Sequence, residues 1–161
     1  MQHKHVEVRR GEHGDYLYLP IPQSKKQDKP ITSMPRAAVA YRRLLDYQRQ
    51  RGYGAETDFL FLPEHSNRQT AYRTLTRQFD VVLNDTSLRV GKDGSQRTLY
   101  SLRHTSIMFR LLYGQGIDML TLARNARTSV NMIERFYASS LSGEMNVGML
   151  QSRRQTAPAP A

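Results

Sequence analysis

The sequence predicts an α+β protein that is mainly helical, in which a small antiparallel β-sheet at the N-terminus precedes a helical body. Residues 15–22 alternate in the manner of a strand, and apolar residues recur at helical spacing from residue 37 onward. A chain of 161 residues is long enough for one domain with its own core, which we assign to residues 1–151. The last ten residues, 152–161, lack the apolar content to fold and are expected to form a disordered tail.

The sheet is expected within residues 4–34. The first strand is HKHVEV (3–8), the second is DYLYLPIP (15–22), and ITSMP (31–35) supplies the return strand. Between the last two lies a polar turn, QSKKQDKP (23–30), which contains Lys25 and Lys26.

Helices are expected over residues 37–52, 68–84, 101–113, 118–126 and 128–141. The first would turn Ala40, Leu44, Leu45 and Tyr47 toward the core. Ser101 is expected to cap the third helix and Asp118 the fourth, with Thr128 or Ser129 at the start of the fifth. The polar, glycine-bearing segment 84–98 is expected to be a loop.

The composition points to a polyanionic partner. Lys and Arg number 24 against 14 acidic residues, a formal charge of +10, and nucleic acid is the commonest partner of such a surface. A ribosomal or membrane-peripheral protein also fits this charge. The chain has no cysteine, no apolar run long enough to span a bilayer and no signal-peptide pattern, so we expect a soluble, cytoplasmic protein.

Neither a cofactor nor a metal is expected. His3 and His5 are close in sequence but have no cysteine or carboxylate beside them, as a metal site would require. The segment GKDGS (91–95) lacks the preceding strand and the spacing of a phosphate-binding glycine loop.

Three segments together carry a resemblance. LYSLRHT (99–105) opens a helix, MIERFYAS places Tyr137 near the end of a later helix, and QSKK places a lysine in the turn between two strands. This set resembles the catalytic domain of the tyrosine recombinases, the phage-integrase family, over about residues 4–141. The resemblance implies that Arg103 binds the scissile phosphate, that Tyr137 is the nucleophile and that Lys25, preferred over Lys26, is the general acid.

Two further positions follow from the resemblance and depart from its usual residues. Tyr100 stands three residues before Arg103, where the family has a histidine, and a phenol is a poorer base at neutral pH. Thr128 stands nine residues before Tyr137, where the family has histidine or tryptophan. Arg-Thr-Ser (127–129) replaces the usual Gly-His-Ser. His104 is interpreted as a structural residue that supports the start of its helix.

The family's first catalytic arginine is not identified in this chain. RRGE (9–12) matches its Arg-x-Gly-Glu pattern through Arg9, but Arg9 lies too close to Lys25 to leave room for the helix and strand that should intervene. We therefore expect the chain to be a C-terminal piece of a longer integrase, with weak or no activity of its own.

The resemblance implies a phage-encoded or bacterial, nucleoid-associated enzyme that integrates or excises a mobile element. Its partners would be double-stranded DNA attachment sites and further copies of itself, which assemble as a tetramer and exchange C-terminal segments such as residues 142–151. Candidate DNA-contacting residues are Arg42, Arg43, Arg68, Arg73, Arg77, Arg89, Lys92 and Arg97.

Other interpretations stay open. The chain is alternatively a non-catalytic DNA-binding relative, or a basic helical domain that binds RNA or protein. In those cases Arg103 is an ordinary helix-start arginine, Tyr137 a core aromatic residue and Lys25 a solvated turn residue.

Overall fold

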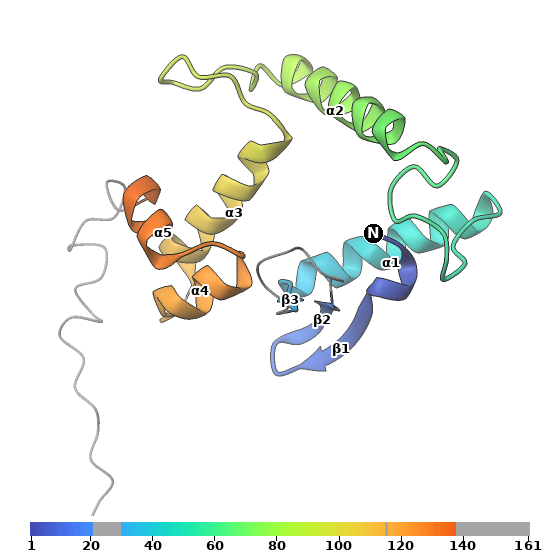
Figure 1. Ribbon diagram of the computed structural model, residues 1–161, viewed down its shortest axis with the longest axis horizontal. Helices are drawn as coiled ribbons and strands as arrows, with labels where there is room; N and C mark the ends of the chain where they lie inside the picture. Colours follow the sequence, from blue (N-terminus) through green and yellow to red (C-terminus); the bar gives the residue numbers. More distant parts are fainter. Residues whose placement is uncertain (21–29, 115, 138–161) are drawn as a thin grey trace, which may run out of the picture.

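The computed structural model describes residues 1–20, 30–114 and 116–137. Within these residues the chain forms a short 3-10 turn, a three-stranded antiparallel sheet and five helices (Figure 1). The elements are η1 (His3–His5), β1 (Glu7–Gly11), β2 (Gly14–Leu19), β3 (Ile31–Thr32), α1 (Pro35–Gln50), α2 (Arg68–Asp85), α3 (Leu99–Tyr113), α4 (Met119–Asn125) and α5 (Val130–Tyr137). The predicted α+β class, with a small N-terminal sheet and a larger helical part, is confirmed.

The sheet has the strand order β1-β2-β3, and both pairings are antiparallel. Gly14 closes the tight turn between β1 and β2 at φ 114°, a backbone conformation that favours glycine. The connection between β2 and β3 contains Lys25 and lies outside the described residues. Residues 31–32 form the predicted return strand and pair with Tyr18 and Leu19.

The first strand begins later than predicted. Residues His3–His5 form a 3-10 turn, and β1 starts at Glu7. The ring of His3 is buried, and its nitrogens lie 3.1 Å from the Tyr41 hydroxyl and 2.7 Å from Oε1 of Gln48. These contacts hold the chain start against α1 and away from the strand direction.

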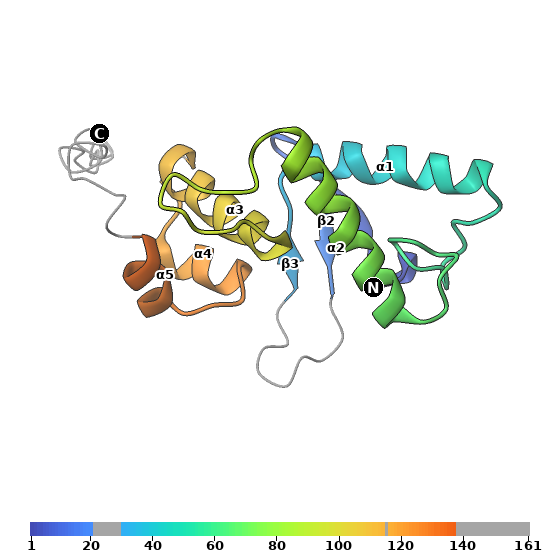
Figure 2. The same ribbon diagram turned by 90° about the horizontal axis from the view of Figure 1, so that it is seen from above.

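Apolar packing in the described residues joins α1 to β2 and forms a cluster among α3, α4 and α5. α1 packs on β2, where Leu17 and Ala38 are buried. The cluster joins α3, α4 and α5 through the buried residues Ile107, Leu122, Ala123, Ile133 and Tyr137. Figure 2 shows these three helices gathered on one side of the molecule, with the sheet and α1 on the other.

The buried face of α1 differs from the predicted one. Ala38 and Gln48 are the buried residues of this helix, whereas Ala40 and Tyr47 are exposed. Gln48 is drawn inward by its polar partners, because its amide nitrogen donates to the Leu60 carbonyl and its oxygen faces the His3 ring.

Helix starts follow local hydrogen bonds. Asn67 caps α2 by accepting from the backbone N–H groups of Gln69 and Thr70, and Asp118 caps α4 as predicted. The predicted cap of α3 is wrong: Thr98 is the N-cap, and Ser101 is the fourth residue of a capping box that the two side chains complete. Ser129, one of the two predicted caps of α5, precedes the helix, and its hydroxyl accepts from the N–H of Met132.

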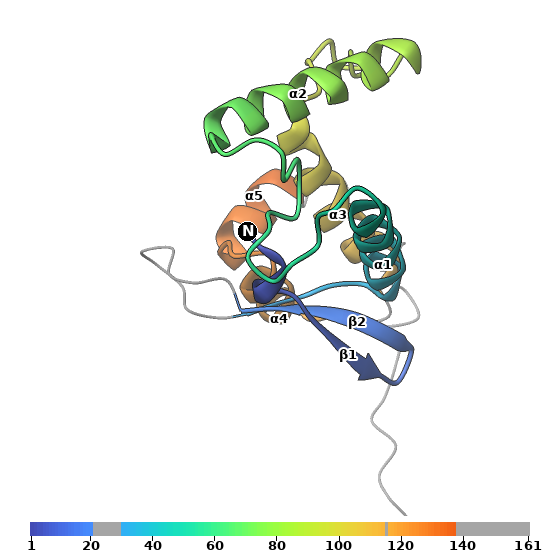
Figure 3. The same ribbon diagram turned by 90° about the vertical axis from the view of Figure 1, so that its right-hand side faces the viewer.

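α2 stands apart from the other helices. Figure 3 shows it at the opposite end of the molecule from β1, with α3 between them. Among the described helices, none combines the length and the apolar character needed to cross a membrane. The predicted tail 152–161 and the segment 142–151 lie outside the described residues.

Candidate functional site

The first two turns of α3 carry three of the residues of interest. The capping box of Thr98 and Ser101 fixes the start of the helix, and Tyr100, Arg103 and His104 follow. Positions three and four apart lie on the same side of a helix, so Tyr100 is a neighbour of both Arg103 and His104. One short helical segment therefore presents a phenol, a guanidinium and an imidazole together.

Tyr137, at the end of α5, meets His104. The Tyr137 hydroxyl lies 2.5 Å from Nδ1 of His104, and the two rings are 5.7 Å apart. Tyr137 is 6% exposed. The contact joins the two helices through a polar pair at the edge of the α3–α5 core.

Aromatic rings enclose the imidazole of His104. Tyr100 packs edge-on against it with ring centroids 4.9 Å apart, and Phe136 lies 6.5 Å away. Tyr100 itself is 62% exposed and Phe136 is 54% exposed, so the cluster lies at the protein surface. Such contacts limit the ring orientations that are open to His104.

Arg103 points toward the turn between α4 and α5. Its Nη2 donates to the backbone carbonyl of Arg127 at 3.4 Å, and Arg127 has a left-handed backbone with φ 52°. Arg103 also lines an open pocket of about 730 Å³ between the β3–α1 segment and helices α3 and α4. Ser33, Met34, Arg110 and Asn125 contribute to the same pocket.

The surroundings of Tyr137 change its proton affinity. Burial raises the pKa of the Tyr137 phenol above its ordinary value, the positive charge of Arg103 lowers it, and Tyr100 raises it further; the net change is upward. The phenol is thus held in its neutral form, while an arginine close by favours negative charge on its oxygen.

Thr128 lies in the same turn as Arg127. Its backbone N–H donates to the Ala123 carbonyl at 2.9 Å and so helps to end α4. Of the five predicted site residues, the structure brings Tyr100, Arg103 and Tyr137 together, and it places Thr128 next to the residue whose carbonyl Arg103 contacts. Lys25 lies outside the described residues.

His104 was expected to support the start of its own helix, and the structure instead places it against Tyr137. A signal was present in the sequence, because His104 follows Tyr100 by four residues and shares its helix face. The partner on α5 depends on how the two helices pack, which helical spacing alone does not reveal.

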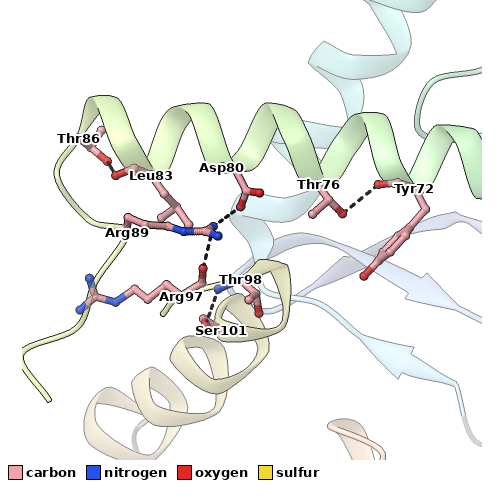
Figure 4. A network of polar contacts seen from close by, with 9 residues as sticks. All are labelled: Tyr72, Thr76, Asp80, Leu83, Thr86, Arg89, Arg97, Thr98 and Ser101. Atoms are coloured by element: carbon pink, nitrogen blue, oxygen red, sulfur yellow. Dashed lines mark hydrogen bonds and ion pairs between the residues drawn. The ribbon is translucent and has the colours of Figure 1, made fainter. Parts of the chain in front are cut away.

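Four of the eight predicted DNA-contacting residues have structural partners. Arg42 forms an ion pair with Asp15 at 2.5 Å, and the Arg68 guanidinium donates to the carbonyls of Phe61, Leu62 and His65. Arg89 pairs with Asp80 of α2 and also donates to the Arg97 carbonyl, as Figure 4 shows. Arg97 in turn donates to the Leu88 carbonyl at 2.8 Å.

The polar network around Arg89 links α2 to α3. Figure 4 shows Asp80 on α2, Arg89 and Arg97 in the connecting loop, and the capping pair Thr98 and Ser101 at the start of α3. The predicted loop 84–98 therefore has defined contacts that hold the end of α2 near the helix that carries Arg103.

The other four basic candidates are exposed: Arg43, Arg73, Arg77 and Lys92. Arg73 and Arg77 are four residues apart on α2 and share one face of that helix. They are therefore better placed to contact phosphate groups than the four arginines that have structural partners.

The histidines near the N-terminus have other partners. His3 lies between Tyr41 and Gln48, and Nδ1 of His5 accepts from the Gln2 backbone N–H at 3.1 Å. Among the residues that the structure describes, no group of three or more His, Asp or Glu side chains is placed to hold a metal ion.

Comparison with models of known protein families, with curated protein sequences and with solved structures gives no match.

Proposed function

We propose that this chain is the catalytic domain of a tyrosine-type, site-specific DNA recombinase. The observation that carries the proposal is the position of Tyr137, whose hydroxyl contacts α3 close enough to Arg103 for the arginine charge to lower its pKa. A nucleophilic phenol and a phosphate-binding guanidinium are two of the three groups that metal-independent phosphodiester cleavage requires, the third being a proton donor for the leaving oxygen.

The turn at Arg127 gives independent support. The left-handed backbone at this position, φ 52°, is a conformation that glycine adopts most easily. In the integrase family the corresponding position is usually a glycine, the first residue of Gly-His-Ser, where this chain has Arg127. The backbone geometry therefore fits the resemblance even though the residue differs.

In this function Tyr137 Oη attacks the scissile phosphorus and forms a 3′-phosphotyrosyl bond, while the P–O5′ bond breaks. The arginine fork of Arg103 contacts the non-bridging oxygens and stabilises the charge that develops there. Such preorganised donors contribute about 3–4 kcal/mol each in oxyanion sites. The 5′ oxygen receives its proton from Lys25, a role that follows from the resemblance.

Tyr100 and Thr128 complete the site with single hydroxyl groups. Tyr100 donates a hydrogen bond to a phosphate oxygen in place of the family histidine, and Thr128 donates one from the α4–α5 turn. Rejoining reverses the first step: a 5′ hydroxyl attacks the phosphotyrosine and releases Tyr137. Partners in this proposal are double-stranded DNA and further copies of the chain.

The experiment is covalent capture on DNA. The full 161-residue chain is incubated with a library of nicked duplexes of randomised sequence, on which a cleaved end diffuses away and traps the covalent adduct. We expect a protein–DNA adduct whose mass maps to Tyr137, which Tyr137→Phe abolishes. Tyr113→Phe is the matched control, since Tyr113 is a 76% exposed phenol at the other end of α3. An adduct that persists in Tyr137→Phe contradicts the proposal.

A DNA-binding relative without cleavage activity is the second candidate. Two observations favour it: Tyr137 is buried with a raised pKa, and a tyrosine occupies position 100 where a histidine is usual. Salt-dependent DNA binding with no adduct from any duplex in the library supports this candidate over the first.

A further inference from the structure

We propose that His104 is the general base that takes the proton from Tyr137, an inference that rests on the proposed function. The distance of 2.5 Å between the Tyr137 hydroxyl and Nδ1 of His104 is within hydrogen-bond reach, the first requirement of a catalytic base. No movement of either helix is needed for the proton to transfer.

The other groups around Tyr137 do not meet that requirement. The guanidinium of Arg103 has only N–H donors, so it stabilises negative charge but has no acceptor atom for the proton. Tyr100 carries an acidic phenol, and Phe136 has no polar atom. Imidazole is the side chain that most often acts as a base near neutral pH, and His104 is the described residue that holds one against the Tyr137 oxygen.

The positions of Tyr100 and His104 on α3 explain which of the two acts as the base. The integrase-like pattern expects its histidine at position 100, and this chain has Tyr100 there. His104 lies four residues further on the same helix face, with its ring edge-on to Tyr100 at 4.9 Å. Tyr100 is therefore a positioning residue for the imidazole as well as the proposed donor to a phosphate oxygen.

The proton balance is as follows. In this mechanism His104 starts as the tautomer with its proton on Nε2, so that Nδ1 accepts the hydrogen bond from the Tyr137 hydroxyl. As the Oη–P bond forms, the phenolic proton moves to Nδ1 and the imidazole becomes cationic. The P–O5′ bond breaks and the 5′ oxygen takes a proton from the general acid. In rejoining, the departing Tyr137 oxygen recovers its proton from Nδ1 of His104.

The raised pKa of the Tyr137 phenol makes a general base necessary. Because burial raises the pKa of the Tyr137 phenol, the free phenolate is scarce at neutral pH, and an unassisted hydroxyl is a weak nucleophile. The cation that forms on His104 lies near Arg103, and the negatively charged transition state between them offsets their repulsion.

The test uses a probe whose leaving group needs no acid. A fluorophosphonate reacts with Tyr137 by forming an Oη–P bond and breaking the P–F bond, and fluoride departs without a proton. Labelling is followed by mass spectrometry on the 161-residue chain without DNA. The informative variant is His104→Asn, because the asparagine Oδ1 replaces Nδ1 as a hydrogen-bond acceptor but does not take the proton.

We expect Tyr137 labelling in His104→Asn to be about a hundredfold slower than in the wild-type chain, with partial recovery of labelling in His104→Ala on addition of free imidazole. His13→Gln is the matched control, since His13 is exposed in the β1–β2 turn and its loss should leave labelling unchanged. Far-UV circular dichroism checks that each variant folds.

Each outcome decides the question. Labelling of His104→Asn at the wild-type rate shows that His104 only holds Tyr137 in place, and it overturns the inference, as does a wild-type Tyr137 that does not react. Labelling that depends on His104 supports the inference even if no DNA adduct forms, a result that would reject the recombinase activity alone. A DNA adduct that forms equally fast in His104→Asn preserves that activity and rejects the base.

Discussion

The side-chain amide of Asn125 exchanges two hydrogen bonds with the backbone of Thr32. The Thr32 N–H donates to Oδ1 at 2.7 Å, and Nδ2 donates to the Thr32 carbonyl at 2.9 Å. Asn125 thereby pairs with the edge of β3 as a neighbouring strand would. Because it is the last residue of α4, it ties the sheet to the helices that carry Arg103 and Tyr137.

Asn125→Ala should loosen this tie. Each lost hydrogen bond costs about 1 kcal/mol, so we expect the free energy of unfolding to fall by about 2 kcal/mol. If Lys25 acts from the β2–β3 connection, cleavage of a nicked duplex should slow at least tenfold. Asn125→Asp is the control that keeps the acceptor and loses the donor, and its effects should be intermediate. If Asn125→Ala cleaved the nicked duplex at the wild-type rate, this contact would not position the general acid.

Position 127 should favour glycine. A left-handed backbone costs a residue with a side chain about 1–2 kcal/mol, and glycine avoids this cost. Because Arg127→Gly and Arg127→Ala both remove the arginine side chain, their difference isolates the backbone term. We expect the glycine variant to be more stable than the alanine variant by about 1 kcal/mol in urea unfolding. Equal stabilities would mean that this turn changes conformation when the side chain is removed.

Arg73 and Arg77 should contribute to DNA affinity through phosphate contacts. Removing both to alanine is expected to weaken binding at low salt and to reduce the slope of log K against log salt by about 1.8, at 0.9 per contact. The control is Arg9→Ala with Arg10→Ala, which removes the same charge from β1, at the opposite end of the molecule from α2. An equal change of slope in the control would indicate long-range attraction rather than contacts by α2.

The stability of the protein should depend on pH through Tyr137. Its pKa is raised in the folded state, so the folded protein holds the phenolic proton more tightly than the unfolded chain does. In the unfolded chain the phenol has its ordinary pKa of about 10. The resulting stabilisation is complete below that pH and is lost as the pH rises through the folded-state pKa. The stability advantage of the wild-type chain over Tyr137→Phe should therefore shrink above pH ~10.

The measurement is urea unfolding of both proteins at several pH values. Tyr41 also has a pKa raised by burial, but it is common to both proteins and cancels in the difference. A wild-type advantage that grows with pH would show that the phenolate, not the phenol, is the form the folded site favours.

Local sequence signals predicted most of the helices and failed where a side chain has a distant partner. Asp118 was correctly identified as a cap because its hydrogen bond goes to Thr121, three residues away. The predicted cap at Ser101 is wrong for a local reason: Thr98 and Ser101 cap each other, and either suits a helix start. The buried Gln48 was not predicted, since its partners His3 and Leu60 lie far along the chain.

In the candidate site, too, the sequence predicts residue types and their order but not the contacts between helices. The types of Arg103 and Tyr137 and their order along the chain led to the prediction, and the structure places them near each other. The contact between His104 and Tyr137 depends on the packing of α5 against α3, which no short-range pattern specifies. The predicted return strand pairs with β2, whereas the predicted turn around Lys25 lies outside the described residues.

Because α2 packs sparsely on the rest of the described structure, we expect it to unfold locally before the other helices. Its packing on other elements is sparse, whereas α4 and α5 pack closely on each other. Amide hydrogens of α2 should thus exchange with solvent through a local unfolding that leaves the α3–α5 core intact. If the chain binds DNA as proposed, bound DNA would slow that exchange. The free energy spent on ordering α2 would then reduce the affinity expected from phosphate contacts by Arg73 and Arg77.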